Sequence, residues 1–385
     1  MTLARTLRPP IGGRREQTAT RIVFFAIGFA SGAWAPLIPF AKARLGAGAG
    51  ELGLLLLCVG LGSILAMPLA GAVVGRLGHR VVLTAASGVT LLVFPLLAIL
   101  SSAPGLAAAL FVFGVGIGSI DCVINMQAIV VERDGGRPLM SGFHALYSLG
   151  GIAGAGGLSA LLAAGASPLA AALCVAAGLL LAAAGAWSGL LARTDAPHGP
   201  AFAAPRGIVL MIAGFCFVVF LTEGAALDWS AVLLRTTGRA SAAQSGLGYV
   251  AFAAAMTVGR LGGDWLVARA GGVRTVALGT VTAAAGLAIA ALAPEWTWSV
   301  VGYGLVGAGC SNVVPVLYSA LGRQTAMPES QAVPAVSVVG YSGLLAGPAA
   351  IGLVADRFGL AVALLGVAAL LLGVAATARR LGRSG

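Results

Sequence analysis

Three acidic residues lie inside stretches that are otherwise apolar. Asp121 stands in a run that begins near residue 106, and Glu223 and Asp228 both stand in "FLTEGAALDWSAVLL" at 220–234. A carboxylate at the centre of a membrane-spanning helix costs roughly 2.5–3.5 kcal/mol, so such an acid normally faces the interior of a helix bundle. There it marks a solute pathway, a proton relay or a partner group. The three acids therefore indicate a polar site within the apolar part of the chain.

Asp121 and Asn125 have a spacing that stacks them on one helix face. Residues four apart are rotated by about 40° and lie one turn from each other. A carboxylate and an amide offer the mixture of acceptors and donors that a hydroxylated solute needs. We predict that both residues bind substrate. The alternative is that they bond to neighbouring helices and only fix their packing.

Glu223 and Asp228 have a spacing that separates them. Five residues correspond to about 140° on an unbroken helix, so the two acids should not share one proton. Burial without a cationic partner favours the neutral form of a carboxyl group, which lets it load and release a proton. We predict proton coupling at Glu223, with Asp228 as a second coupling candidate that lines or seals the entry. A plain interhelical hydrogen bond is the alternative for both.

His144 carries Tyr147 and Ser148 at the third and fourth positions after it, which makes a polar stripe on one helix face. The unperturbed pKa of histidine, about 6.5, suits proton transfer, so His144 is a candidate proton relay. A hydrogen-bonded structural histidine is the alternative.

Two further candidates for substrate binding are Asn312 and Trp34. Asn312 precedes Pro315, and a proline in a spanning helix frees a carbonyl that the amide can satisfy instead of binding solute. Trp34, beside Pro36, can stack against a sugar ring. Its alternative role is that of an interfacial anchor.

The composition shows where these residues must lie. Of the 385 residues, 59% are hydrophobic and 9% are charged, with a mean hydropathy of +1.00, which is too apolar for a soluble globule of this size. The apolar runs have helix length and lack period-two alternation, which excludes an outer-membrane barrel. The 58 glycines favour close helix packing. Glycine pairs four apart recur at Gly28/Gly32, Gly71/Gly75, Gly114/Gly118, Gly150/Gly154 and Gly343/Gly347.

Twelve apolar runs are predicted to span the membrane. They lie near 20–41, 51–74, 81–100, 106–131, 138–165, 169–191, 207–234, 244–268, 273–293, 298–322, 331–355 and 360–378. The first run follows an Arg-bearing tail without a small-residue cleavage site, so we expect a retained helix. The stretch "ARTDAPHGPAFAAPR" divides the runs six and six. We predict a six-helix bundle at 1–191, a cytoplasmic linker at 192–206 and a second six-helix bundle at 207–385.

The distribution of Lys and Arg predicts the orientation. With a cytoplasmic N-terminus, 18 of the 23 basic residues fall inside, including Arg5, Arg8 and Arg193. The positive-inside rule therefore places both termini in the cytoplasm. A shift of 193 residues also lays Gly154 on Gly347 and Arg76 on Arg269. Two parallel repeats of this kind are typical of one class of transporters, which bind solute at midplane between the repeats.

The loops at 71–80 and 259–274 carry a family resemblance. "GAVVGRLGHR" and "GRLGGDWLVARAGGVR" resemble the Gly-x-x-x-Asp-Arg-x-Gly-Arg-Arg signature of the major facilitator superfamily and its counterpart in the second half. The stretches at 124–151 and 223–235 resemble a bacterial branch related to the fucose permeases. Gly75 stands where the signature usually has Asp, so the lock that this Asp helps to form in the family must differ here. The resemblance implies gating roles for Gly71, Arg76, Gly78, Arg80, Arg260 and Asp264.

Arg260 and Asp264 are four residues apart, and we expect them to neutralise each other within one helix. The net charge of +11 does not indicate nucleic acid, because the basic residues stand singly between apolar runs. The five cysteines are odd in number and show no metal-ligand spacing, so neither disulfides nor a metal are predicted. A phosphate-binding loop and a nucleophile elbow are absent. We predict no enzyme activity and no cofactor.

The sequence thus predicts an all-α membrane protein with the major facilitator fold, working in the bacterial inner membrane as a secondary transporter. The expected partners are a small polar solute of sugar or polyol type, protons and the lipid bilayer. We expect a monomer that works by proton-coupled symport. Proton-coupled efflux of hydrophobic compounds is the first alternative, and a solute sensor that does not transport is the second.

Overall fold

A computed structural model describes residues 12–192, 201–236, 240–241 and 244–383, and these residues are helical with no strand among them. Residues 193–200 of the predicted linker, and Arg5, Arg8 and Arg193, lie outside the described residues. The first group of helices comprises α1 (Arg14–Trp34), η1 (Ala35–Leu37), α2 (Ile38–Leu45), α3 (Ala49–Leu77), α4 (His79–Leu97), α5 (Ala103–Gly135), α6 (Met140–Ala163), α7 (Pro168–Ala186) and η2 (Trp187–Gly189). The second group comprises α8 (Ile208–Thr236), α9 (Leu247–Leu261), α10 (Gly263–Ala270), α11 (Gly272–Leu292), α12 (Trp296–Cys310), α13 (Val313–Leu321), α14 (Glu329–Phe358), α15 (Leu360–Thr377) and η3 (Ala378–Arg383).

The predicted spans correspond to these helices. Within the described ranges, 11 helical segments are long and apolar enough to cross a membrane. The eighth predicted span, 244–268, is divided at Gly262 into α9 and α10, and α9 has only 15 residues. About 20 residues are needed to cross the hydrocarbon, so neither piece crosses alone. The all-helical prediction is confirmed. The boundaries 1–191 and 207–385 stay predictions.

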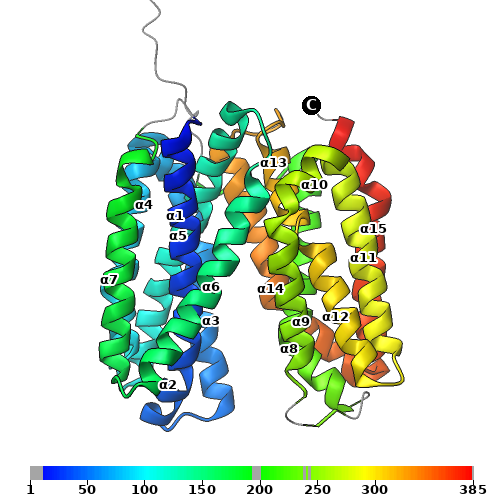
Figure 1. The fold of residues 1–385 in the computed structure, drawn as a ribbon, viewed down its shortest axis with the longest axis horizontal. Coiled ribbons are helices and arrows are strands. Elements are labelled where there is room, and N and C mark those ends of the chain that lie inside the picture. Colours follow the sequence, from blue (N-terminus) through cyan, green and yellow to red (C-terminus); the bar gives the residue numbers. More distant parts are fainter. Residues whose placement is uncertain (1–11, 193–200, 237–239, 242–243, 384–385) are drawn as a thin grey trace, which may run out of the picture.

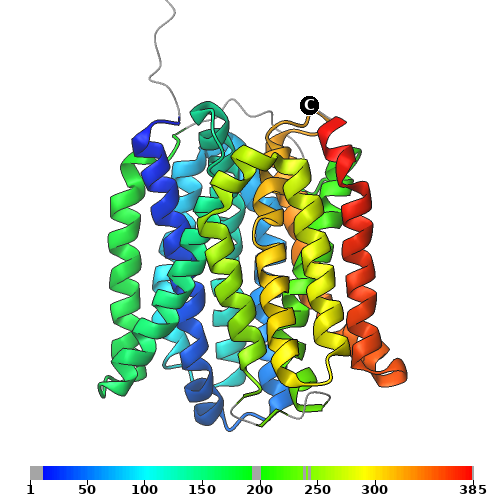
Figure 2. The ribbon, with the colours of Figure 1, turned by 45° about the vertical axis from the view of Figure 1, so that its right-hand side comes forward.

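The two groups of helices lie side by side. Figure 1 shows them close together at one end, where α1 begins and α15 ends, and farther apart at the other. We call the first of these the termini end and the second the opposite end. Figure 2 shows that the helices run roughly parallel in a view turned by 45°.

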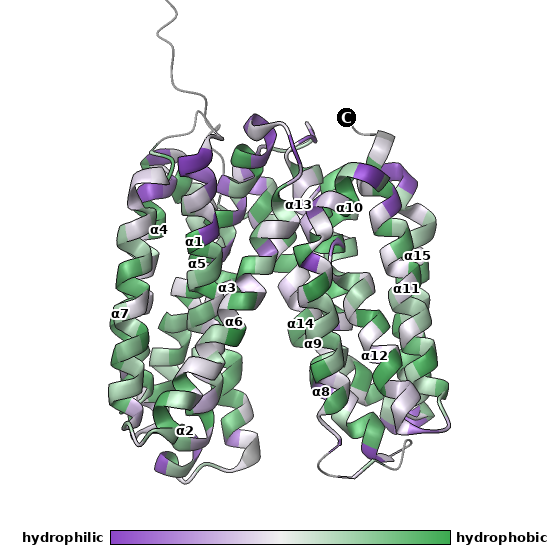
Figure 3. Cartoon of the chain, in the orientation of Figure 1, coloured by the Kyte–Doolittle hydropathy of each residue, from purple (hydrophilic) through white to green (hydrophobic). Residues whose placement is uncertain are grey.

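The outer surface is apolar over most of its height. Along α3 one face exposes leucines and a valine at three- and four-residue spacing, namely Leu54, Leu57, Leu61, Leu65, Leu69 and Val73. Figure 3 shows hydrophilic residues gathered at the two ends of the molecule and hydrophobic residues between them. Such a stripe would be unfavourable in water but is matched by lipid tails.

Glycines allow the helices to pack closely inside each group. A Cβ on Gly150 of α6 would overlap the backbone oxygen of Phe25 in α1 and would lie 3.0 Å from the backbone nitrogen of Phe29. Gly114 of α5 likewise faces the backbone of Val59 in α3, and Gly343 of α14 faces that of Phe217 in α8. The glycine pairs in the sequence therefore mark helix contacts in both groups, as small residues do in membrane bundles.

We expect Gly150→Ala to lower the melting temperature of the purified protein, because the added methyl group must push the α1 backbone away. Overpacking of this kind costs about 1–3 kcal/mol. Gly156 of α6 is the matched control, since a Cβ there would meet nothing within 4 Å. Gly156→Ala should leave the melting temperature unchanged or slightly raised. Equal melting temperatures for the two variants would contradict this packing argument.

Candidate functional site

A cavity of about 190 Å³ lies between the two groups of helices. Its lining comes from α1, α5 and α6 on one side and from α8, α9, α13 and α14 on the other. The apolar part of the lining is Phe24, Phe220, Val314 and Leu344. The remaining residues carry polar or charged groups, namely Asp121, Asn125, His144, Tyr147, Glu223, Arg260, Tyr318 and Tyr341. This cavity is therefore the candidate functional site.

Asp121 is held by groups from both sides of the cavity. The Asn125 amide donates to the backbone oxygen of Asp121 at 2.9 Å and to its Oδ1 at 3.3 Å. Tyr341, on α14, donates its hydroxyl to Asp121 Oδ2 at 3.2 Å. The spacing of four residues thus brings Asp121 and Asn125 together on one face, and a contact between the two helix groups completes the cluster.

The Asn125 side chain has unused hydrogen-bonding capacity. Its Oδ1 is buried and has no partner among the described residues. A buried acceptor without a donor costs about 1–3 kcal/mol. A hydroxyl or amine group of a solute in the cavity would supply the missing donor.

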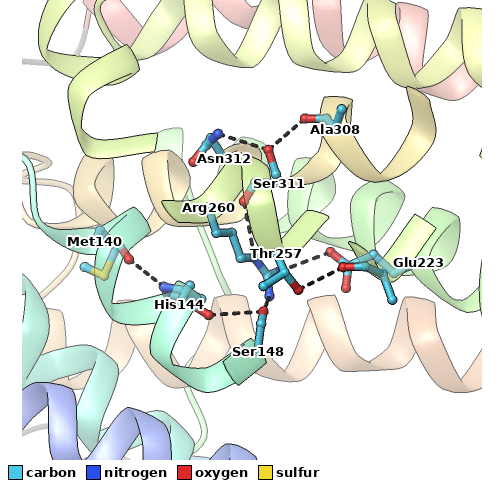
Figure 4. A network of polar contacts seen from close by, with 10 residues as sticks. Met140, His144, Ser148, Glu223, Thr257, Arg260, Ala308, Ser311 and Asn312 are labelled. Carbon is cyan, nitrogen blue, oxygen red and sulfur yellow. Dashed lines mark hydrogen bonds and ion pairs between the residues drawn. The ribbon is translucent and has the colours of Figure 1, made fainter. Parts of the chain in front are cut away.

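Arg260 connects the second acid to the other helix group. Its Nη2 lies 3.9 Å from Glu223 Oε1, and its Nη1 donates to Ser148 Oγ at 2.9 Å. Its Nε donates to the backbone oxygen of Ser311 at 3.3 Å. Figure 4 shows the guanidinium group among Glu223, Ser148 and Ser311. Glu223 and Arg260 belong to the second group and Ser148 to the first. The Arg260 side chain therefore contacts both an acid of its own group and a helix of the other group.

The expected pairing of Arg260 with Asp264 is wrong. Arg260 contacts Glu223, Ser148 and Ser311, whereas Asp264 accepts a hydrogen bond from the backbone nitrogen of Gly142. Glu223 therefore has a cation close by, contrary to the expectation of an acid without a cationic partner. The distance of 3.9 Å is too long for a hydrogen bond, and Glu223 Oε1 has no hydrogen-bond partner among the described residues.

His144 lines the cavity next to two aromatic rings. Its Nδ1 lies 2.9 Å from the backbone oxygen of Met140. A carbonyl oxygen only accepts, so Nδ1 carries a hydrogen. The ring centroid lies 5.1 Å from that of Phe24 and 6.1 Å from that of Tyr318. Tyr318 in turn shares a 2.7 Å hydrogen bond with Ser337 Oγ.

Three predicted site residues lie outside the cavity lining. Trp34 is 7% exposed and its Nε1 has no partner among the described residues. Asn312 stands between α12 and α13, where its amide donates to the backbone oxygen of Gly259 at 3.0 Å and to Ser311 Oγ at 2.9 Å. Asp228 is exposed, more than a turn beyond Glu223 along α8. The structure brings together Asp121, Asn125, Glu223 and His144 and leaves these three apart from them.

The residues predicted to gate lie toward the termini end. Asp264 Oδ2 accepts a hydrogen bond from the backbone nitrogen of Gly142 at 3.1 Å, which joins α10 to the first turn of α6. Gly71 faces Pro334 and the backbone oxygen of Ser330 on α14, where a Cβ would not fit. Both contacts link one helix group to the other.

The other predicted gating residues act within the first group. Arg80 donates to the backbone oxygen of Leu190 and lies over the ring of Trp187. Gly78 has a positive φ of 82° at the junction of α3 and α4. Arg76 is exposed near the end of α3. Among the described residues, no three His, Cys, Asp or Glu side chains come together as metal ligands.

Sequence reasoning missed Tyr318, Tyr341 and Phe220 as lining residues. The chain has five tyrosines, and all of them fall in predicted spans. Three of the five, including Tyr147, line the cavity. A tyrosine hydroxyl in hydrocarbon needs a partner, and this was the signal that could have pointed to the cavity.

Comparisons with known proteins agree with this architecture. The chain is 48% identical over 372 residues to an uncharacterised MFS-type transporter of Yersinia pestis, and the match covers 96% of this chain and 97% of that protein. The fold is similar to that of the E. coli fucose:proton symporter FucP, with a TM-score of 0.75, 17% identity and coverage of 95% and 98%. It is equally similar to the proton:xylose symporter XylE, with a TM-score of 0.75, 11% identity and coverage of 95% of both chains. No protein-family model matches the sequence.

Two groups of membrane helices around one polar cavity are the architecture of a membrane transporter. The extent of the match to the Yersinia protein identifies the family, and the chain belongs to the major facilitator superfamily. The family prediction from the signature loops is therefore confirmed.

We expect Arg260→Gln to lower the melting temperature strongly, because it leaves Glu223 inside the bundle without its cation. Removing one partner of a buried ion pair costs about 3–5 kcal/mol. The double variant Arg260→Gln, Glu223→Gln should melt at a higher temperature than Arg260→Gln alone. Thermal unfolding followed by tryptophan fluorescence would measure this. Strictly additive effects of the two substitutions would show that the two side chains do not interact.

Proposed function

We propose that the protein moves a small polar solute of sugar or polyol type across the bacterial inner membrane. The observation that carries this proposal is the lining of the cavity, in which eight of twelve side chains are polar or charged and both helix groups contribute. Hydroxyl groups of a solute find both donors and acceptors there, while Tyr147, Tyr318 and Tyr341 offer rings and hydroxyls together.

The volume of the cavity supports a small solute. About 190 Å³ is less than the roughly 300–1,000 Å³ that is typical of sites for drug-sized ligands. Efflux of hydrophobic compounds is the alternative function. An apolar compound would remove water from Asp121, Asn125 and Arg260 without replacing their hydrogen bonds, which is unfavourable.

Proton coupling is assigned to Glu223 on the basis of its loose contact with Arg260. A proton on Glu223 would remove the ion pair and leave Arg260 to its bonds with Ser148 and the backbone of Ser311. Ser148 belongs to the other helix group. Protonation of Glu223 would therefore change the balance of contacts that Arg260 makes within its own group and with the other group. This gives a physical route from protonation to the relative position of the two groups.

The termini end is assigned to the cytoplasm by the positive-inside rule. Contacts between the groups at that end, such as the bond from Gly142 to Asp264, hold it closed in this arrangement. The Glu223 side chain, which lines the cavity, keeps 18% of its surface exposed. We therefore assign the structure to a conformation closed toward the cytoplasm. Symport into the cell is the direction that we propose for transport.

We expect Glu223→Gln to keep exchange of solute across proteoliposome membranes but to lose its accumulation against a gradient. The amide keeps the shape of the side chain and cannot release a proton. The readout is uptake of a radiolabelled sugar or polyol, first selected by its effect on the melting temperature, with and without an imposed proton gradient. Asp228→Asn is the matched comparison and should still accumulate solute, because Asp228 is exposed outside the cavity lining.

Other results would redirect the assignment. Full accumulation by Glu223→Gln would remove Glu223 from the coupling role, and loss of accumulation only in Asp228→Asn would transfer that role to Asp228. Accumulation by the unmodified protein after collapse of the proton gradient would refute proton coupling. Binding of solute without any flux would favour the sensor alternative.

A further inference from the structure

A second and larger cavity, of about 340 Å³, lies at the termini end. It is lined by the last turns of α5 and the loop after it, by the junction of α10 and α11, and by α13 and the residues that follow. Its lining thus comes from both groups of helices. The candidate site described above shares none of its lining residues with this cavity.

Three arginines line this cavity, namely Arg133, Arg137 and Arg323, and all three are exposed. Arg133 pairs with Glu329 and with Asp134. Arg137 Nη2 donates to Gln17 Oε1 at 3.2 Å, and Arg137 makes no ion pair with an acid among the described residues. The side chain of Arg323 has no hydrogen bond or ion pair with any described residue. Within the part of the chain that the structure describes, two of the three arginines therefore have no acidic partner.

The lining contains one acidic residue, Glu132, and its carboxylate already accepts hydrogen bonds. Glu132 Oε2 accepts hydrogen bonds from the backbone nitrogens of Leu139 and Met140, at 2.7 and 2.8 Å, and so caps the start of α6. On the other side, α11 begins at Gly272, which also lines the cavity. The positive end of a long helix, next to arginines that have no acidic partner among the described residues, favours an anion.

We propose that this cavity binds a phosphate-bearing anion, held by Arg137 and Arg323 and by the start of α11. The bound anion bridges the two helix groups, because Arg137 belongs to the first group and Arg323 to the second. Binding therefore stabilises the arrangement in which the termini end is closed. Two sources of this chemistry are a soluble phosphate and the phosphate of an anionic lipid headgroup, and both meet the same side chains.

The test uses inorganic phosphate and the full-length protein in detergent. A ligand that binds the folded state raises the melting temperature, so titration with phosphate should raise it with saturation. Sodium chloride at matched ionic strength should not. Arg323→Gln and Arg137→Gln should each raise the half-saturating phosphate concentration about tenfold, the effect of losing one charge-assisted hydrogen bond. Arg379→Gln, an exposed arginine in η3 at the same end but outside the lining, should match the unmodified protein.

Equilibrium dialysis with radiolabelled phosphate gives a direct second measurement, which does not depend on transport or on the stability of the variants. Less than stoichiometric retention by the unmodified protein at saturating phosphate would overturn the proposal. The same half-saturating concentration in all variants would overturn it as well. Failure of solute transport would leave this result untouched, since no transport step enters the measurement.

Reconstitution distinguishes the two sources. Protein in vesicles of phosphatidylcholine should bind phosphate as it does in detergent. If added phosphatidylglycerol raises the half-saturating phosphate concentration, the lipid headgroup competes for the site and is its occupant. If it has no effect, the site takes a soluble phosphate.

Discussion

The structure depends on one constraint, which is the cost of placing carboxylates at membrane depth. Hydrogen bonds from Asn125 and Tyr341 stabilise Asp121, and the nearby cation of Arg260 stabilises Glu223. None of these partners fits on a lipid-facing surface, so the acids must face inward and the helices must enclose a polar space. The glycines then bring the helix backbones into contact within each group, which leaves the space between the groups for the cavity.

Polar contacts between the two groups are few, and each is modest. Tyr341 donates to Asp121, Arg260 donates to Ser148, and the Gly142 nitrogen donates to Asp264. A typical hydrogen bond contributes about 0.5–1.5 kcal/mol net, or about 1.5–3 kcal/mol with a charged partner. A few such bonds amount to the few kcal/mol that separate the conformations of a two-state protein. A proton or a solute that changes one of them can therefore shift the balance.

Local sequence patterns predicted the features that depend on a single helix. They failed for contacts between residues that lie far apart in the sequence. Run length gave the spans, and the four-residue spacing gave the stacking of Asp121 and Asn125. The pairing of Arg260 with Glu223 could not be derived, because it depends on the approach of α8 to α9 in the folded chain. Asn312 was expected at the solute, but it bonds instead to the backbone of α9, which lies beside it only in the folded chain.

The repeat in the sequence becomes unequal at the termini end. Asp264 and Gly71 correspond under the shift of 193 residues, as do α6 and α14. In the second group the position holds a carboxylate that accepts a hydrogen bond from the start of α6. In the first it holds a glycine that admits Pro334 of α14, and Gly75 supplies no acid either. A hydrogen bond to a carboxylate therefore joins α10 to α6, whereas close packing joins α3 to α14. Arg133 and Glu329 add an exposed ion pair beside the contact of α3 with α14. Exposed pairs contribute little, so the contact of α3 with α14 depends on the close packing at Gly71 and that of α10 with α6 on the hydrogen bond to Asp264.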